Sequence, residues 1–257
     1  MFQYTDTSIQ EIPGKISLIL YTGGCNLTCP WCFNKDIRYH KPLSWKQMKE
    51  AIDEYRDFVD GVVFSGGEPL LNRYLIKTIK YAKSNGLKVK INTNGLVSSD
   101  IQDNWYVGFI DYLNVSLKGT FTEYNAIMNN KPFCSLCLCA DILEYSFVYS
   151  PVLWPPAKLS EFHNFLKNQL SDSWYSLFNY DHWTRPDILT VSQLQSGFCW
   201  DEQLNNIPSP TEQECIDVAC IFRDIPKKKL MVETKEYGRK IIEKKHNNKK
   251  KGCYYPK

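Results

Sequence analysis

Three cysteines gather in one short stretch, GCNLTCPWCFN, which runs from residue 24 to residue 34. Cys25, Cys29 and Cys32 have the spacing CxxxCxxC, and no fourth cysteine lies nearby. A structural zinc site usually takes four ligands, often as two pairs set well apart. A [4Fe-4S] cluster has four irons, so three thiolates leave the fourth iron open to a ligand that is not protein. The spacing favours such a cluster, and a zinc site remains the alternative for this motif alone.

The elements around the cysteines alternate between strand and helix. Short apolar, β-branched runs predict strands at residues 15–21, 60–67, 87–95, 111–119 and 146–152. Helical periodicity predicts helices at 43–59, with Ser44 as N-cap, and at 71–86, 98–109, 133–145, 159–170 and 211–225. Thr211 and Glu214 have capping-box spacing. Residues 173–180 are a further candidate strand, 181–210 read as mixed loop, and 227–242 as a final hairpin.

Polar and glycine-rich residues follow each early strand, as TGGC, SGGEP, TNG and SLKG. Alternating strands and helices predict a parallel sheet covered by helices. Loops at the carboxyl ends of parallel strands lie along one edge of the sheet, where such folds bind ligands. We therefore expect the cysteine loop and the other three loops to meet at one rim.

Composition narrows the class of protein. The chain has 257 residues, 43% hydrophobic and 23% charged, which is ordinary for a soluble globular protein. No apolar run of about 18 residues is present, and the first residues lack the layout of a secretory signal. We therefore expect no membrane span and a cytoplasmic location. Because that compartment is reducing, the ten cysteines are not expected to form a disulfide framework.

The cysteine motif and the loops together resemble the radical S-adenosylmethionine (radical SAM) superfamily. CxxxCxxC follows a first strand, Trp31 precedes the last cysteine, and GGEP follows the second strand. The resemblance implies a partial (β/α)6 TIM-like barrel of α/β class, with residues 1–225 as core and 226–257 as a basic C-terminal extension. It also implies a [4Fe-4S] cluster and S-adenosylmethionine as cofactors. The reduced cluster would cleave S-adenosylmethionine to a 5′-deoxyadenosyl radical that abstracts hydrogen.

The resemblance assigns roles to single residues. Cys25, Cys29 and Cys32 would ligate the cluster, and Trp31 would pack on the adenine. The backbone of the SGGEP loop and Glu68 would hold the methionine amino group, a match of cation and carboxylate. The full candidate set for S-adenosylmethionine is Trp31, Ser65, Gly66, Gly67, Glu68, Thr93, Asn94 and Lys118. Ser116 stands where relatives carry an acid and Phe33 where many carry His, so those roles are absent. Taken alone, TNG reads as a turn and Lys118 as a solvated charge.

Residues 8–128 most resemble the activating enzymes of glycyl radical enzymes, including short activase-like proteins of anaerobic ribonucleotide reductase. A glycyl radical enzyme is therefore the first expected substrate, with a flavodoxin or ferredoxin as electron donor. Modification of a peptide or tRNA is the second expectation. A non-enzymatic iron–sulfur electron carrier or redox sensor is the alternative from another class, although a carrier favours four protein ligands.

Two features stay open from sequence alone. Residues 227–257 hold twelve Lys or Arg against three Glu, so this tail could contact nucleic acid or simply be a solvated terminus. The cysteines outside the motif could serve a second cluster or pack in the core, and we favour packing. They are Cys134, Cys137, Cys139, Cys199, Cys215, Cys220 and Cys253.

Overall fold

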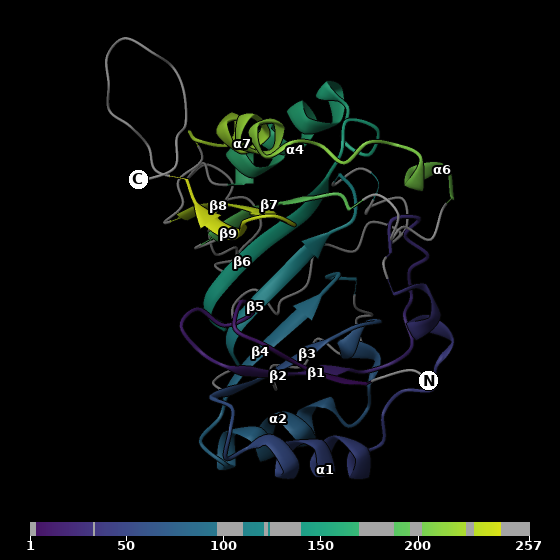
Figure 1. The fold of residues 1–257 in the computed structure, drawn as a ribbon, viewed down its shortest axis with the longest axis vertical. Helices are drawn as coiled ribbons and strands as arrows, with labels where there is room; N and C mark the ends of the chain where they lie inside the picture. The colour runs from purple at the N-terminus through teal and green to yellow at the C-terminus, as the bar shows by residue number, and fades with distance from the viewer. Residues whose placement is uncertain are drawn as a thin grey trace. The chain divides into compact units, whose positions relative to one another are not determined.

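The computed structural model of the chain describes residues 4–32, 34–96, 110–120, 123, 140–169, 188–195, 202–224 and 229–242 (Figure 1). The chain divides into two compact units. The first comprises residues 1–116 and 133–143, and the second comprises residues 117–132 and 144–257. Among the described residues, no helix has the length and apolar character that crossing a membrane requires.

The first unit is built on parallel strands. Strand β1 (Thr5–Ser8) pairs antiparallel with β2 (Ser17–Tyr21). Strands β2, β3 (Gly61–Ser65), β4 (Lys88–Thr93) and β5 (Ile110–Leu117) then pair in parallel and in chain order. One row of the register runs Leu20, Phe64, Ile91 and Leu113, and all four side chains are buried. This row anchors the strands, so that their carboxyl ends lie at one edge.

Two helices cover the sheet of the first unit on one side (Figure 1). Helix α1 (Trp45–Tyr55) starts at the predicted N-cap, where Ser44 and Gln47 form a capping box. Helix α2 (Leu75–Ser84) ends just before Gly86, whose φ of 78° suits a glycine. Short 3₁₀ turns at η1 (Lys35–Tyr39) and η2 (Pro69–Leu71) follow the loops after β2 and β3. The predicted strands and helices of residues 15–95 are thus confirmed.

The second unit has its own parallel strands. Strand β6 (Ala140–Tyr149) begins in the first unit, and its residues 144–149 pair with β7 (Ile188–Gln193) in the second. Strand β8 (Lys229–Thr234) is parallel to β7, and β9 (Gly238–Ile241) returns antiparallel, which confirms the final hairpin. The described helices of this unit are α4 (Pro156–Gln169), α6 (Glu202–Asn205) and α7 (Glu212–Ile221). Its aromatic core consists of Phe147, Trp154, Phe162 and Phe222.

Two predictions for the second half of the chain are wrong. Residues 140–145, predicted as part of a helix, belong to strand β6. The buried aromatic side chains of Tyr145, Phe147 and Tyr149 recur at a spacing of two, which is the period of a strand. Strand β7 lies in a segment that was predicted as loop. The predicted helix at 98–109 and strand at 173–180 lie outside the described residues.

The fold class itself is confirmed as α/β with parallel strands and helices packed on them. The capping box of Thr211 and Glu214 is present at the start of α7. Since residues 229–242 pair within the sheet of the second unit, regular structure continues past residue 225. The division at that residue stays a prediction.

Candidate metal centre

The cysteine loop follows β2 directly. Cys25, Cys29 and Cys32 are reduced and partly exposed. The Leu27 amide nitrogen donates to Cys25 Sγ at 3.5 Å, and the Cys32 amide donates to the Cys29 carbonyl at 3.0 Å. An amide donor stabilises a thiolate, since hydrogen bonding to a charged form favours that form. The loop therefore offers three accessible sulfurs, one of them with a backbone donor.

Glycines allow the cysteine loop and the SGGEP loop to touch. Gly24 has a φ of 73° and Gly67 a φ of 62°, both in the left-handed region that favours glycine. A Cβ added to Gly67 would lie 2.0 Å from the Gly24 carbonyl oxygen. The Glu68 amide donates to that same oxygen at 2.8 Å. The two backbones are thus in direct contact, and no room is left between them for a side chain at residue 67.

We expect Gly67→Ala to lower the free energy of unfolding more than Gly86→Ala does. Both glycines have positive φ, which costs alanine about 1–2 kcal/mol. Gly86 has open space around its missing Cβ, whereas Gly67 faces backbone, so overpacking adds about 1–3 kcal/mol at Gly67. Urea unfolding of the two variants measures the difference. Equal losses would show that the contact between the two loops is looser than described.

Glu68 is the centre of the site rather than a side chain on its surface. Its side chain is fully buried. Oε1 accepts from the Leu70 amide at 3.1 Å and from Thr93 Oγ1 at 2.8 Å, and Oε2 accepts from the Asn94 amide at 2.8 Å. Glu68 therefore ties the SGGEP loop to the TNG loop at the end of β4. The predicted role of this carboxylate as a ligand for the methionine end stays a prediction, and the structure adds its bonds to the protein.

The TNG loop is in turn bonded to the cysteine loop. Asn94 Nδ2 donates to Asn26 Oδ1 at 2.8 Å, and Asn26 Nδ2 donates to the Leu96 carbonyl at 2.8 Å. Asn94 Oδ1 accepts from the Leu96 amide at 2.8 Å, and Thr93 Oγ1 accepts from the Gly95 amide at 3.0 Å. The predicted meeting of these three loops is therefore present within the first unit. Asn26 was missed by sequence reasoning, since nothing marks it apart from its place beside Cys25.

The face of this sheet that carries Tyr21 is polar toward the carboxyl ends of its strands. Tyr21 is in register with Ser65, and Asn92 with Asn114, on neighbouring strands. Asn92 Nδ2 donates to Ser65 Oγ at 3.5 Å, and Asn92 Oδ1 is buried with no hydrogen-bond partner among the described residues. Burial, and then the nearby carboxylates of Asp6 and Glu11, raise the pKa of Tyr21, which keeps it neutral.

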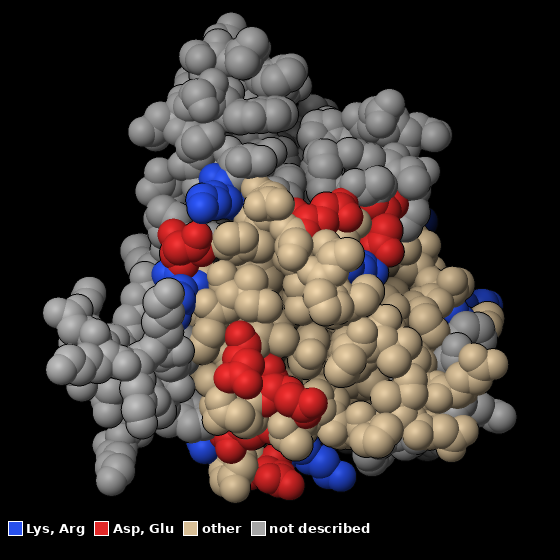
Figure 2. All heavy atoms as spheres, turned by 90° about the horizontal axis from the view of Figure 1, so that it is seen from above, with Lys and Arg blue, Asp and Glu red and all other residues tan. Residues whose placement is uncertain are grey.

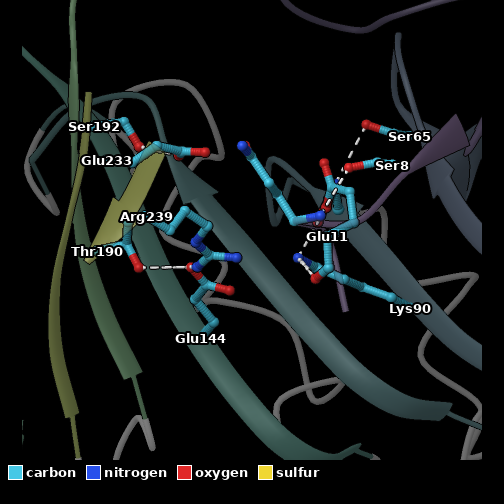
Figure 3. A network of polar contacts seen from close by, with 11 residues as sticks. Ser8, Glu11, Ser65, Lys90, Glu144, Thr190, Ser192, Glu233 and Arg239 are labelled. Carbon is cyan, nitrogen blue, oxygen red and sulfur yellow. Dashed lines mark hydrogen bonds and ion pairs between the residues drawn. The ribbon is translucent and has the colours of Figure 1, made fainter. Parts of the chain in front are cut away.

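An ion pair with a buried lysine lies deeper on the same face (Figure 3). Lys90 is 3% exposed, and its Nζ lies 2.9 Å from Glu11 Oε2 and donates to the Glu11 carbonyl at 2.8 Å. Asn92 Nδ2 also donates to Glu11 Oε2, at 3.1 Å. Glu11 thus fixes the segment before β2 against β4, which positions the strand that leads into the cysteine loop.

The remaining candidates are less closely connected. Trp31 and Ser116 are partly exposed, on the cysteine loop and at the end of β5. Lys118 follows β5 by one residue and is partly exposed, but it belongs to the second unit, so the structure does not group it with the three loops. Its loop is held by Glu123, which accepts from the Thr120 amide at 2.6 Å.

In the second unit, polar side chains line the sheet face opposite Phe147 (Figure 3). Thr190 Oγ1 donates to Glu144 Oε1 at 2.6 Å, and Arg239 forms an ion pair with the same carboxylate. Ser192 Oγ donates to Glu233 Oε2 at 2.9 Å. Sequence reasoning missed these residues because β7 was read as loop, although ILTVSQ alternates apolar and polar from Leu189 onward.

The other cysteines divide into described and undescribed positions. Cys215 on α7 is fully buried, which confirms core packing for this residue. Cys220, also on α7, is disulfide-bonded. Cys134, Cys137, Cys139, Cys199 and Cys253 lie outside the described residues.

We expect Cys215 to make folding less favourable as the pH rises above 9. Burial, and then the nearby carboxylates of Glu214 and Glu212, raise the pKa of the Cys215 thiol to about 12. The unfolded chain releases this proton near pH 8.5, so between about pH 9 and 12 stability falls with pH. Urea unfolding at pH 8 and pH 10 measures how steeply the free energy of unfolding falls with pH. This fall should be smaller for Cys215→Ala than for the unchanged chain. Identical slopes would contradict the raised pKa.

The donors of the cysteine loop fit an iron–sulfur cluster. Among the described residues, no three His, Cys, Asp or Glu side chains converge to hold a single metal ion. A cubane differs from a single ion because each thiolate binds its own iron, so the sulfurs stand apart. Three reduced, partly exposed thiols on one loop suit this arrangement, and they suit zinc less well.

Comparison with known proteins agrees with this chemistry. Residues 19–134 match the model of the Radical SAM superfamily. A protein of Methanocaldococcus jannaschii, named as a candidate glycyl-radical enzyme activating enzyme, is 25% identical over 233 residues, 85% of this chain and 89% of that protein. The 7-carboxy-7-deazaguanine synthase of Hyperthermus butylicus is 36% identical over 97 residues, which cover 35% of this chain and 39% of the synthase.

Among solved structures, SuiB of Streptococcus suis, crystallised with the precursor peptide SuiA, has a TM-score of 0.51 and 14% identity. The match covers 84% of this chain, which spans about half of the SuiB chain (48%), and it bears on the fold alone. Radical SAM enzymes have a partial TIM barrel and use a [4Fe-4S] cluster with S-adenosylmethionine, and these are the fold class and cofactors of this chain. Residues 19–134 of this chain thus match the radical SAM superfamily.

Proposed function

We propose that this chain cleaves S-adenosylmethionine reductively and uses the resulting radical to activate a glycyl radical enzyme. The observation that carries the proposal is the bonded set of three loops at the carboxyl ends of β2, β3 and β4. Catalytic groups are effective when they are held in place before the substrate arrives. When bound, the reduced cluster supplies the electron that breaks the sulfonium bond of S-adenosylmethionine.

The chain's own residues would divide the work as follows. Cys25, Cys29 and Cys32 hold the cluster on an accessible loop. The partly exposed backbone of residues 65–67 would bind the methionine end, and Trp31 would pack on the adenine. Glu68 acts through the protein, because its carboxylate already accepts from Thr93 and Asn94. Lys118, on the loop after β5, stays a candidate cation for the carboxylate of S-adenosylmethionine.

The substrate proposal is supported by sequence. The Methanocaldococcus jannaschii relative covers most of both chains, so the likeness extends beyond the superfamily motifs. In that reaction, the 5′-deoxyadenosyl radical takes a hydrogen atom from a backbone glycine Cα. The products are 5′-deoxyadenosine and a glycyl radical. The chain would work in the cytoplasm with a flavodoxin or ferredoxin as electron donor.

Charge lends little support to nucleic acid as a substrate. Most of the basic tail lies outside the described residues. On the face seen in Figure 2, acidic side chains form small groups and the described residues make no extended basic patch. Electrostatic binding to nucleic acid needs clustered Lys and Arg. A tRNA substrate would therefore depend on residues 243–257, and removing them tests that dependence.

The decisive test is anaerobic. The chain is reconstituted with iron and sulfide, reduced with dithionite and mixed with S-adenosylmethionine, and iron content and 5′-deoxyadenosine are measured. We expect four irons per chain and formation of 5′-deoxyadenosine. A loaded cluster that never cleaves S-adenosylmethionine, even with candidate substrates present, would favour the carrier or sensor alternative. Close to eight irons would place a second cluster on the remaining cysteines.

A glycine-containing peptide from a glycyl radical enzyme separates the substrate classes. When this peptide is added to the reduced, cluster-loaded chain with S-adenosylmethionine, an organic radical at one glycine should be detected by electron paramagnetic resonance (EPR). A peptide in which that glycine is replaced by alanine should give no signal. A signal of equal size with unrelated peptides would favour general peptide modification instead.

A further inference from the structure

Asn26 lies next to a cluster cysteine, and both polar ends of its side chain are used. Oδ1 accepts from Asn94 Nδ2 and Nδ2 donates to the Leu96 carbonyl, each at 2.8 Å. Both partners lie on the TNG loop, about 70 residues further along the chain. An amide side chain with one donor and one acceptor fixed in this way has a single orientation.

The partner of Asn26 is firmly held. Asn94 is 5% exposed, its amide donates to buried Glu68, and its Oδ1 accepts from the Leu96 amide. Its side-chain nitrogen is thus oriented by two other hydrogen bonds of the same residue before it meets Asn26. The Glu68 backbone amide also donates to the carbonyl of Gly24, two residues before Asn26, which joins the SGGEP loop to the cysteine loop. The cysteine loop is therefore tied at Gly24 and Asn26, on either side of Cys25.

Asn26 is itself exposed, so its role is not to fill the core. Removing an exposed side chain leaves no cavity, and the chain should still fold. What disappears is the pair of hydrogen bonds that joins the cysteine loop to the TNG loop. Loops with few such ties open locally at little free-energy cost.

We propose that Asn26 is a positioning residue that fixes Cys25, and with it the cluster, relative to the TNG and SGGEP loops. The inference rests on the proposed function, since it assigns Asn26 a task only if the cysteine loop holds a cluster. Both polar ends of the Asn26 side chain are taken up by Asn94 and the backbone of Leu96, so it would act through them. Misplacement of about 1 Å at a reacting centre can reduce a rate about 100-fold.

The test compares Asn26→Ala with Asn85→Ala in the full chain. Asn85 also donates one side-chain hydrogen bond and accepts one, to Tyr81 and from Arg56, but it lies at the end of α2, before β4 begins. It therefore controls for the loss of an asparagine with two bonds. Hydrogen exchange of residues 22–34 in the apoprotein gives a reading that needs no cluster.

In Asn26→Ala we expect exchange of residues 22–34 to rise about tenfold, the effect of losing hydrogen bonds worth about 1.4 kcal/mol in total. Iron release to a chelator should be correspondingly faster. The S-adenosylmethionine concentration that half-converts the EPR spectrum of the reduced cluster should rise by a similar factor. Asn85→Ala should match the unchanged chain in all three readings.

Each other outcome overturns the inference. Exchange unchanged in Asn26→Ala would show that the two loops are not joined through this side chain. Faster exchange with unchanged iron release and unchanged dependence on S-adenosylmethionine would limit Asn26 to loop structure. If the unchanged chain binds no cluster, the proposed function fails first and the inference fails with it. A normal cluster in both variants, with equal readings, refutes the inference alone.

Discussion

Replacing Cys29 with alanine is expected to abolish the formation of 5′-deoxyadenosine. The variant loses one of three proposed iron ligands, so the chain retains less iron after anaerobic reconstitution. The rate of cleavage should fall by more than about 100-fold, since the loss of an outer partner of a metal ligand alone costs about 10–100-fold. Iron content and 5′-deoxyadenosine, measured on the same sample, check both parts.

Cys215→Ala is the matched control for this variant. It makes the same chemical change at a thiol that is buried on α7 and lies outside the motif. It should keep the iron content and cleavage rate of the unchanged chain, with some loss of stability from the small cavity. If Cys29→Ala retained full cleavage, the motif would not be the cluster site. If both variants lost the cluster, global unfolding would be the cause.

The site was predictable where a local signal coincides with the end of a strand. The loops after β2, β3 and β4 each contain a glycine close to the end of the strand. These glycines, Gly24, Gly67 and Gly95, adopt positive φ. Glycine is favoured at such positions for reasons that act within a few residues. The order of strands then follows from their alternation with helices, so the meeting of the loops could be predicted.

The second half was harder because its local signals are ambiguous. The segment ADILEYSFVY combines good helix formers with alternating aromatics, and burial of Tyr145, Phe147 and Tyr149 within the second unit selects the strand. Strand β7 is only six residues long, so its alternation covers too few positions to stand out from loop. In both cases tertiary packing, and not local preference, decides the structure.

The contacts that join the loops could not be read from sequence, since they connect residues far apart in the chain. Asn26 pairs with Asn94 across 68 positions, and Glu68 with Asn94 across 26. Motif resemblance assigned Glu68 to a ligand because a carboxylate suits an ammonium group. In the structure the carboxylate is buried and paired within the protein, as a buried carboxylate must be, so the role toward a ligand stays a prediction beside this structural one.

Glu68→Gln is therefore expected to destabilise the protein even when no cofactor is bound. The glutamine keeps the shape, but one oxygen becomes an NH₂ group, which must face either the Asn94 amide or the donors at Oε1. Losing charge-assisted bonds and opposing two donors should lower the free energy of unfolding of the apoprotein by about 2–4 kcal/mol. Urea unfolding without cluster or S-adenosylmethionine measures this loss.

A surface ligand for the methionine ammonium would behave oppositely, because its replacement would spare the apoprotein and weaken only cofactor binding. An apoprotein of unchanged stability would thus return Glu68 to the role of direct ligand, whereas a large loss identifies it as the residue that keeps the site assembled before its cofactors arrive.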